Sequence, residues 1–322
     1  MKRRHLLIAA AVTAALPLFA RGQSYPSKPI SWVVGFPPGG GADGVTRLVA
    51  AKVSRNIGKP IVVENRPGAS SIIAAQYVAQ APADGYTLFS CEQGSLVFNT
   101  ALYSKLPYDP ARDFAPVTDM IRAPLLLTVN AGFPASDLAS FVEYVRKQPG
   151  KLNYGSPGRG LAHQLAMEAF KGRAKLDIVD VQYKGIAPVV QDVIAGQVPM
   201  AAIDTVVVLP QLKSGKLRAL ASFSTKRLAV TPDVPSLAEL GYEGLDIAPI
   251  VGVVVPRATP REVVARLNAE VVRALRDPEV SAKLTGLGLE IIGDTPEQFA
   301  AFLQSEGNRW LPLIRSLNIK LD

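Results

Sequence analysis

Two glycine-rich segments of this sequence have the composition and position expected of a ligand-binding site. The segment 36–43 reads F-P-P-G-G-G-A-D, and the segment 155–161 reads G-S-P-G-R-G-L. Each one joins an apolar run of strand type to a stretch with helical periodicity. Glycine lets the backbone approach a ligand closely, and the first turn of a helix has unpaired N–H groups and a partial positive charge. The two loops therefore predict a site for one small anion, although each alone is also compatible with an ordinary turn.

The two loops do not match the patterns that bind nucleotides. Neither contains G-x-x-x-x-G-K-[ST], and neither contains G-x-G-x-x-G with an acidic residue about 20 positions later. The chain has one cysteine, Cys91, and two histidines, His5 and His163, which excludes an intrachain disulfide and a centre of several histidines. We therefore expect no cofactor and no metal, and we interpret Cys91 as a small buried apolar residue.

Several single side chains near the loops have two interpretations each. Arg159 either pairs with a ligand carboxylate or is a solvated loop charge, and Lys184 is an ordinary solvated lysine unless a ligand reaches it. Asp204 ends an apolar strand, where it either meets a ligand donor or caps the next helix. Ser156 and His163 raise the alternative of an exported hydrolase. Because Ser156 lacks a G-x-S-x-G elbow, a packing or capping role is favoured for His163.

The composition excludes two classes of protein. The 322 residues are 48% hydrophobic, so the chain has enough apolar surface to fold rather than remain disordered. The net charge is +8, and four basic residues within 1–22, where no acid occurs, contribute half of it. No basic cluster is interleaved with aromatic residues, so no nucleic acid partner is expected.

Residues 1–22 have the pattern of a cleavable signal peptide. Three basic residues at 2–4 precede an apolar run over 6–19, and small residues allow cleavage between Gly22 and Gln23. No later apolar run approaches the roughly 20 residues needed to span a bilayer, so we do not expect a membrane-embedded protein. We expect export to a bacterial periplasm by the Sec route or, given the adjacent arginines, by the twin-arginine route.

After residue 22 the sequence alternates apolar runs with amphipathic stretches, which is the pattern of an α/β protein. We expect strands over 30–35, 61–64, 86–90, 125–129, 179–183, 200–204, 218–222 and 250–255. Ser136 is expected to cap a helix that runs to Gln148, Pro260 to lie at the start of another and Thr295 to open the last. Two similar α/β halves result. Each contains one glycine-rich loop after a strand, where open α/β sheets bind ligands.

The motifs of this sequence, taken in their order, resemble the Bug family of extracytoplasmic solute receptors. These receptors, also called TctC proteins, are the binding proteins of tripartite tricarboxylate transporters. The similar segments lie at 25–30 (Y-P-S-K-P-I), 35–43 (G-F-P-P-G-G-G-A-D), 63–69 (V-E-N-R-P-G-A), 83–88 (A-D-G-Y-T-L), 99–103 (N-T-A-L-Y), 113–117 (D-F-A-P-V), 152–156 (L-N-Y-G-S), 182–185 (Q-Y-K-G), 215–220 (G-K-L-R-A-L) and 232–236 (P-D-V-P-S). They extend over essentially the whole chain after residue 22.

The resemblance implies a two-lobed periplasmic-binding-protein fold of type II-like form. Each lobe would contain a central, mostly parallel sheet flanked by helices, with two crossover hinge strands between the lobes. Lobe 1 would comprise residues 24–122 and 250–322, and lobe 2 residues 123–249. A small carboxylate would be captured between the lobes without catalysis. It would pass to TctA/TctB-like membrane transporter subunits or to a signalling partner, and a receptor of an ABC or TRAP transporter is the alternative.

The resemblance also implies which residues contact the ligand. In the family the first loop grips a carboxylate through main-chain groups, and the second loop often carries hydroxyls where this sequence has Leu161 and Ala162. The segment 90–95 corresponds to one that commonly supplies side-chain contacts. The residues expected in the site are Phe36, Pro38, Gly39, Gly40, Gly41, Ala42, Asp43, Gln93, Ser95, Ser156, Arg159, Gly160, Leu161, Ala162, His163, Lys184 and Asp204.

Overall fold

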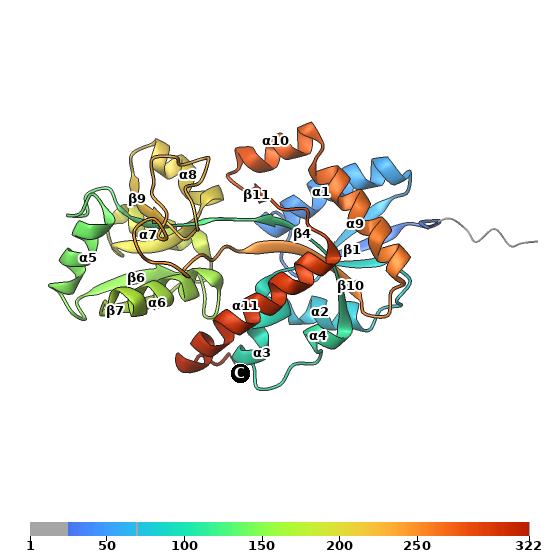
Figure 1. Cartoon of the computed structure of the whole chain (residues 1–322), viewed down its shortest axis with the longest axis horizontal. Helices are drawn as coiled ribbons and strands as arrows, with labels where there is room; N and C mark the ends of the chain where they lie inside the picture. Colours follow the sequence, from blue (N-terminus) through green and yellow to red (C-terminus); the bar gives the residue numbers. More distant parts are fainter. Residues whose placement is uncertain (1–24, 69, 322) are drawn as a thin grey trace, which may run out of the picture.

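The computed structural model, drawn in Figure 1, describes residues 25–68 and 70–321 of the chain. The signal peptide predicted over 1–22, together with its cleavage site, lies outside the described residues. No described helix is both long and apolar enough to cross a membrane. The described chain forms two lobes, each built on one β-sheet and flanked by helices, which confirms the predicted two-lobed α/β fold.

The first lobe is built on a six-stranded sheet, sheet A, with strand order β11-β4-β10-β3-β1-β2. Its strands are β1 Ile30–Val34, β2 Ile61–Asn65, β3 Thr87–Cys91, β4 Phe114–Arg122, β10 Ile250–Pro256 and β11 Glu290–Ile291. Its helices are α1 Gly41–Ile57, α2 Ile72–Ala79, the π-helix η1 Gly94–Phe98, α3 Asn99–Leu102, α4 Pro110–Asp113, α9 Arg261–Leu275, α10 Pro278–Gly286 and α11 Pro296–Ser316.

The second lobe is built on a five-stranded sheet, sheet B, with strand order β7-β6-β8-β5-β9. Its strands are β5 Leu125–Asn130, β6 Leu152–Ser156, β7 Ile178–Gln182, β8 Met200–Asp204 and β9 Leu217–Ser222. Its helices are α5 Leu138–Arg146, α6 Ala162–Ala174, α7 Ile186–Ala195 and α8 Thr205–Lys213. Both sheets are mixed rather than mostly parallel, because β10 and β5 run antiparallel to both of their neighbours.

Helix α1 illustrates how the sequence holds a candidate loop on its sheet. Val45, Val49 and Val53 are spaced four residues apart, so they share one face of the helix, and all three are buried. That face belongs to one apolar cluster with Trp32 of β1 and Leu267 of α9. Burying each such side chain contributes about 1.5–3 kcal/mol. The glycine-rich loop that precedes α1 is therefore anchored at its helical end.

The predicted strands are all present, whereas β4, β6 and β11 are absent from the list of expected strands. The sequence pattern does not predict β4, because Pro116, Thr118 and Asp119 interrupt its apolar residues. The prediction that Ser136 caps the helix after β5 is wrong. Asp137 is the N-cap of α5, since its carboxylate accepts a hydrogen bond from the Ser140 N–H at 2.8 Å in a reciprocal capping box.

Candidate functional site

The strand register places the carboxyl ends of both sets of parallel strands beside one short connection. β4 runs in the same direction as β3, since both are antiparallel to β10, and it ends at Arg122. β5 begins at Leu125, opposite Asp204 at the carboxyl end of β8. Two residues separate β4 from β5, so these strand ends lie within roughly 11 Å of each other. The loops that follow β1 and β3 and those that follow β6 and β8 therefore face each other across the connection.

The first glycine-rich loop is organised by the carboxylate of Asp43, which is buried. It accepts hydrogen bonds from the Gly39 N–H at 2.9 Å, from Arg47 Nε at 3.0 Å and from Asn65 Nδ2 at 2.7 Å. Burial acts to raise the pKa of Asp43, but these three hydrogen bonds outweigh it and hold the pKa below its usual value. Asn65 also donates to the Phe36 carbonyl at 3.0 Å, so both ends of the loop are fixed.

This loop leaves its backbone open to a ligand. Gly39, Gly40 and Gly41 are exposed, as is Pro38, whereas Phe36 and Ala42 are half-buried. Gly40 is the N-cap of α1, and no side chain caps the helix. The N–H groups of the first turn therefore lack a side-chain acceptor, which is the arrangement that binds an anion.

The second glycine-rich loop is held by a buried polar network. Ser156 is fully buried, and its hydroxyl donates to Asp180 Oδ1 at 2.7 Å. Gln164 Nε2 donates to the other oxygen of Asp180 at 2.6 Å, and Gln164 Oε1 accepts from the Gly160 N–H at 2.7 Å. Gln182 also donates to Asp180. Burial raises the pKa of Asp180, while its three donors oppose that rise.

Helix α6 starts from this loop in the same way that α1 starts from the first one. Leu161 is its N-cap, and no side chain caps the helix. Ala162, the first helical residue, is buried. Because these two positions lack hydroxyls, the first-turn N–H groups of α6 also have no side-chain acceptor. Two uncapped helix starts, one in each lobe, therefore lie at facing sheet edges.

Comparison with known proteins identifies the family to which this arrangement belongs. A family model described as the tripartite tricarboxylate transporter family receptor matches residues 45–319. The chain belongs to this family. Protein BugT of Bordetella pertussis is 32% identical over 310 residues, which cover 96% of this chain and 95% of BugT.

Two solved structures show the same fold with a ligand named in each. "R. palustris Rpa4515 with adipate" is 35% identical, with a TM-score of 0.81 over 92% of this chain and 100% of that chain. "MatC (Rpa3494) from Rhodopseudomonas palustris with bound malate" is 34% identical, with a TM-score of 0.77 over 90% of this chain and 100% of that chain. The resemblance that the sequence motifs carry is thereby confirmed, and the chain is a solute receptor by family.

The side chains of Gln93 and Ser95 form hydrogen bonds with backbone groups in this receptor. Gln93 Nε2 donates to the Ala248 carbonyl at 2.7 Å, and its Oε1 accepts from the Ile250 N–H at 3.1 Å. The Ser95 hydroxyl donates to the Glu92 carbonyl at 3.1 Å. Both side chains are buried. The geometry gives them positioning roles in the segment after β3, and their direct contact with a ligand stays a prediction.

The residues of the hydrolase alternative are not paired with each other. Ser156 donates to Asp180, and His163 Nε2 lies 3.5 Å from Asp204 Oδ2. His163 Nδ1 is buried without a partner among the described residues. Asp204 is the N-cap of α8 and accepts from the Val207 N–H at 3.3 Å. A Ser–His nucleophile needs the histidine beside the hydroxyl and access to the substrate, whereas the Ser156 hydroxyl is buried and bonded to Asp180 rather than to His163.

Two further predicted residues, Arg159 and Lys184, have exposed side chains. Arg159 lines a pocket of about 560 Å³ together with Gln164, Asp180 and residues 317–319. In the described part of the chain, no group of three or more His, Cys, Asp or Glu side chains is arranged to hold a metal ion. Sequence reasoning missed Gln164 and Asp180. The position of Gln164, one helical turn after Gly160, is a signal that predicts such a contact.

Proposed function

We propose that this protein is a periplasmic receptor that captures a small carboxylate between its two lobes, without catalysis. The observation that carries the proposal is the pair of uncapped helix starts, at Gly40–Gly41 and at Leu161–Ala162, on facing sheet edges. Relatives that bind adipate and malate on the same fold support a carboxylate as the ligand class. Charge-assisted hydrogen bonds from backbone N–H groups in a closing cleft supply the binding free energy.

The roles of the predicted site residues follow from this proposal. Residues 36–43 hold one carboxylate through main-chain N–H groups, with Asp43 shaping the loop. Residues 156–163 face the ligand from the other lobe, where Leu161 and Ala162 favour a ligand with an apolar middle. Arg159 and Lys184, both exposed, are available to a second anionic group.

The lobe boundaries and the cellular setting are part of the same proposal. Lobe 1 comprises residues 24–122 and 250–322, and lobe 2 residues 123–249. Sheet A draws its strands from the first set and sheet B from the second, which supports this division. The signal peptide directs export, and the loaded receptor docks on TctA/TctB-like membrane subunits of a tripartite tricarboxylate-type transporter.

A thermal-shift screen of the mature protein tests the ligand class. We expect malate, adipate or an aromatic carboxylate to raise the melting temperature, and the matched neutral compound, such as adipamide, to leave it unchanged. Binding by mass action stabilises the folded state by about 2.7 kcal/mol at a hundredfold excess over Kd. If none of a broad set of acids raises the melting temperature, the proposal is wrong.

The non-catalytic role is tested by following the ligand after binding. We expect acids and their esters to be recovered unchanged from incubation with the protein, and the Ser156→Ala variant to behave in the same way. Turnover that is lost in Ser156→Ala would instead establish the hydrolase.

A further inference from the structure

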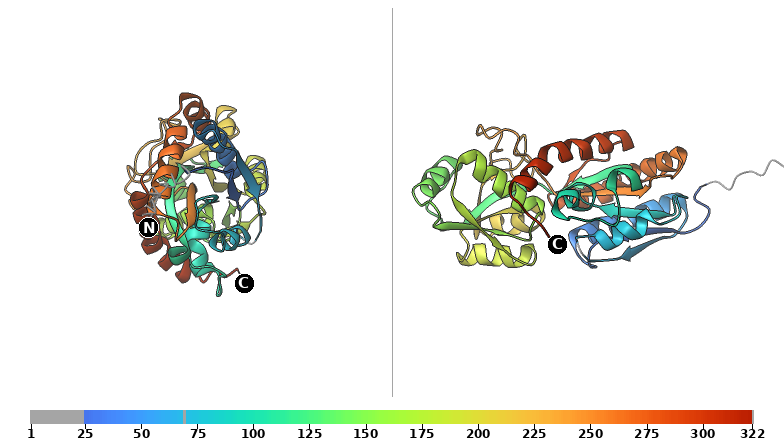
Figure 2. Two further views of the ribbon diagram at one scale, coloured as in Figure 1. Left: turned by 90° about the vertical axis from the view of Figure 1, so that its right-hand side faces the viewer. Right: turned by 90° about the horizontal axis from the view of Figure 1, so that it is seen from below.

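Glu92 directly follows β3, at the edge of sheet A that meets the second lobe. Cys91, the last residue of β3, lies opposite Gly252 of β10. β10 begins two residues earlier, at Ile250, where the chain comes back from the second lobe through the return connection. In this antiparallel register Glu92 lies level with the point of entry. The right-hand view of Figure 2 shows the second lobe, in green and yellow, beyond that end of the first lobe.

The alternation of side chains along β3 places Glu92 on the face of sheet A that α1 covers. Two residues earlier, the Ser90 hydroxyl accepts a hydrogen bond from Trp32 Nε1 at 2.9 Å. The same hydroxyl lies 2.7 Å from Thr46 Oγ1 of α1. Because successive side chains of a strand point to opposite faces, Glu92 shares the face of Ser90.

The start of α1 lies level with Glu92. This helix runs back from the carboxyl end of β1 to the amino end of β2, since the two strands are parallel. Along the helix Gly41 precedes Thr46 by about 7.5 Å, and along the strand direction Glu92 follows Ser90 by about 6.6 Å. Thr46 and Ser90 are in contact, so Gly41 and Glu92 both lie at the carboxyl edge of the sheet. A carboxylate held by the first turn of α1 is therefore next to Glu92.

The carboxyl group of Glu92 has no hydrogen-bond or ion-pair partner among the described residues. Its backbone is fixed by Ser95, because the Glu92 N–H donates to Ser95 Oγ at 3.4 Å and the hydroxyl donates to the Glu92 carbonyl at 3.1 Å. The side chain is half-buried, and burial alone raises the pKa of Glu92 to about 8. No neighbouring donor compensates for the water that burial removes.

The other acidic side chains near these strand ends do have donors. They are Asp43, Glu64, Asp180 and Asp204, which accept hydrogen bonds from Gly39, Ser31, Ser156 and Val207 respectively. Glu92 differs from all four, although it lies beside the helix start that fits an anion.

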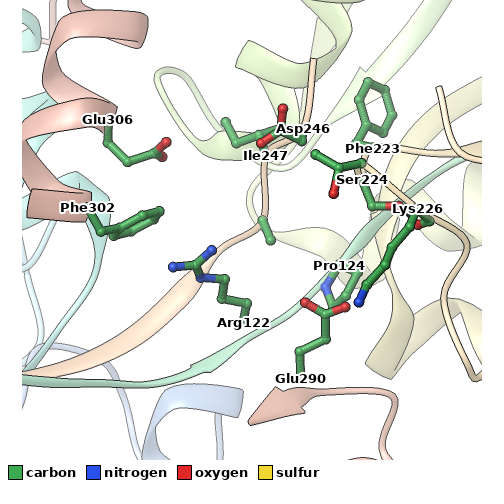
Figure 3. A pocket seen from close by; sticks show the side chains of 12 residues that line it. Arg122, Pro124, Phe223, Ser224, Lys226, Asp246, Ile247, Glu290, Phe302 and Glu306 are labelled. Atoms are coloured by element: carbon green, nitrogen blue, oxygen red, sulfur yellow. Dashed lines mark hydrogen bonds between the residues drawn. The ribbon is translucent and has the colours of Figure 1, made fainter. Parts of the chain in front are cut away.

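The cation beside the first connection does not neutralise Glu92. Arg122 lines the pocket shown in Figure 3, where its guanidinium lies 4.0 Å from the Phe302 ring and its Nε donates to Asp119 at 2.9 Å. Phe302 belongs to α11, whose buried apolar side chains share a cluster with α2, whereas those of α1 belong to another cluster. Arg122 therefore serves the face of sheet A opposite Glu92.

We propose that Glu92 determines specificity, by selecting acids that carry a hydroxyl or ammonium group on the carbon next to the bound carboxylate. This inference rests on the proposed function and narrows its ligand class to 2-hydroxy and 2-amino acids. An unsubstituted acid places a negative charge beside Glu92 and offers it no donor, and like charges repel. A hydroxyl or ammonium group on C2 donates to the Glu92 carboxyl and replaces the lost water.

Calorimetric titration with matched acids tests this selection. Three triplets each keep one chain length and differ only at C2: propanoate, lactate and alanine; succinate, malate and aspartate; adipate, 2-hydroxyadipate and 2-aminoadipate. In the triplet that binds best, we expect the hydroxy or amino acid to bind at least tenfold more tightly than the unsubstituted acid, because hydrogen bonds to charged groups are strong.

Glu92→Gln should reduce this ratio to below threefold, mainly because the unsubstituted acid binds more tightly once the charge is gone. Glu64→Gln is the matched control, since it removes the same charge at the carboxyl end of β2, where the carboxylate accepts from Ser31 Oγ at 2.9 Å. The control should keep the ratio of the wild type.

Thermal unfolding of the ligand-free proteins tests the unpartnered carboxyl separately. The folded pKa of about 8 lies above the unfolded value of about 4.3, so Glu92 makes stability fall as the pH rises between these values. The melting temperature of Glu92→Gln minus that of the wild type should therefore increase from pH 5 to pH 8. A constant difference would show that the Glu92 carboxyl has a partner in the fold, and the proposed selection would be wrong.

The outcomes separate this inference from the proposed function. If acids bind but the wild type shows no preference within a triplet, or Glu92→Gln keeps the preference, the carboxylate function stands and the role of Glu92 is wrong. If no acid binds to the wild type or to Glu92→Gln, the carboxylate function fails and the role of Glu92 fails with it.

Discussion

The side-chain amide of Gln93 and the backbone carbonyl of Ala248 are joined by a hydrogen bond of 2.7 Å, although 155 residues separate them in sequence. The same amide accepts from the Ile250 N–H at 3.1 Å. Gln93 therefore ties the segment after β3 to the point at which the return connection enters β10. Its buried position makes both hydrogen bonds structural.

We predict that Gln93→Ala lowers the free energy of unfolding by about 1–3 kcal/mol, because it leaves two buried backbone groups without partners. Urea denaturation measures the change, and Gln191→Ala, on the exposed face of α7, provides the control. A variant as stable as the wild type would show that water replaces the amide at no cost.

The sequence predicts the strands well because each is a compact apolar run between turn residues. Ile250–Pro256 is buried along its whole length and gives a strong signal of this kind. The polar contacts that shape the site are harder to predict. Gln93 has no periodic pattern that points to Ala248, and Asp180 lies 24 residues from Ser156 in sequence. Such pairings depend on how the strands are ordered in the sheet, which local patterns do not encode.

Asp43→Ala should weaken ligand binding at least tenfold while leaving the fold intact. The carboxylate accepts from Gly39, Arg47 and Asn65, so its loss releases the loop whose N–H groups we propose to hold the anion. We expect a cost of about 1–3 kcal/mol in the free energy of unfolding. Calorimetric titration with the best acid from the thermal-shift screen measures the affinity.

Asp43→Asn should be measured beside Asp43→Ala, because the asparagine side chain keeps one oxygen that can accept hydrogen bonds from the loop. It should lie between Asp43→Ala and the wild type in affinity. The exposed Asp233→Ala is the control for a change of charge. Equal affinities in all of these variants would mean that the loop is shaped without Asp43.

Gly160→Ala should separate the lobes at their contact and weaken ligand binding. Gly160 has a φ of +71°, and a Cβ there would overlap the side chain of Leu102. The left-handed conformation costs roughly 1–2 kcal/mol for a residue with a Cβ. Leu102→Ala in the same protein removes the overlap but leaves this backbone strain, so we expect the double variant to recover affinity in part. If the single variant binds like the wild type, the contact has no role in closure.

The last prediction concerns Asp119, a fully buried carboxyl beside the first connection. Burial raises its pKa to about 7; Arg122, bound at 2.9 Å, opposes the rise, and the charges of Asp294 and Glu306 add to it. An unfolded aspartate has a pKa of about 3.9. Between these values the folded protein holds a proton that the unfolded chain has lost. Asp119 therefore makes stability fall as the pH rises from about 4 to about 7, and the loss is complete above the folded pKa.

Asp119→Asn should remove this dependence, because its amide oxygen still accepts from Arg122 Nε and does not titrate. The free energy of unfolding of the wild type minus that of the variant should decrease across the window, by at most about 1.4 kcal/mol per pH unit. Urea denaturation of both proteins at several values between pH 4 and pH 8 gives the difference, with the exposed Asp233→Asn as control. Parallel stability curves would show that Asp119 stays ionised throughout, held by its ion pair with Arg122.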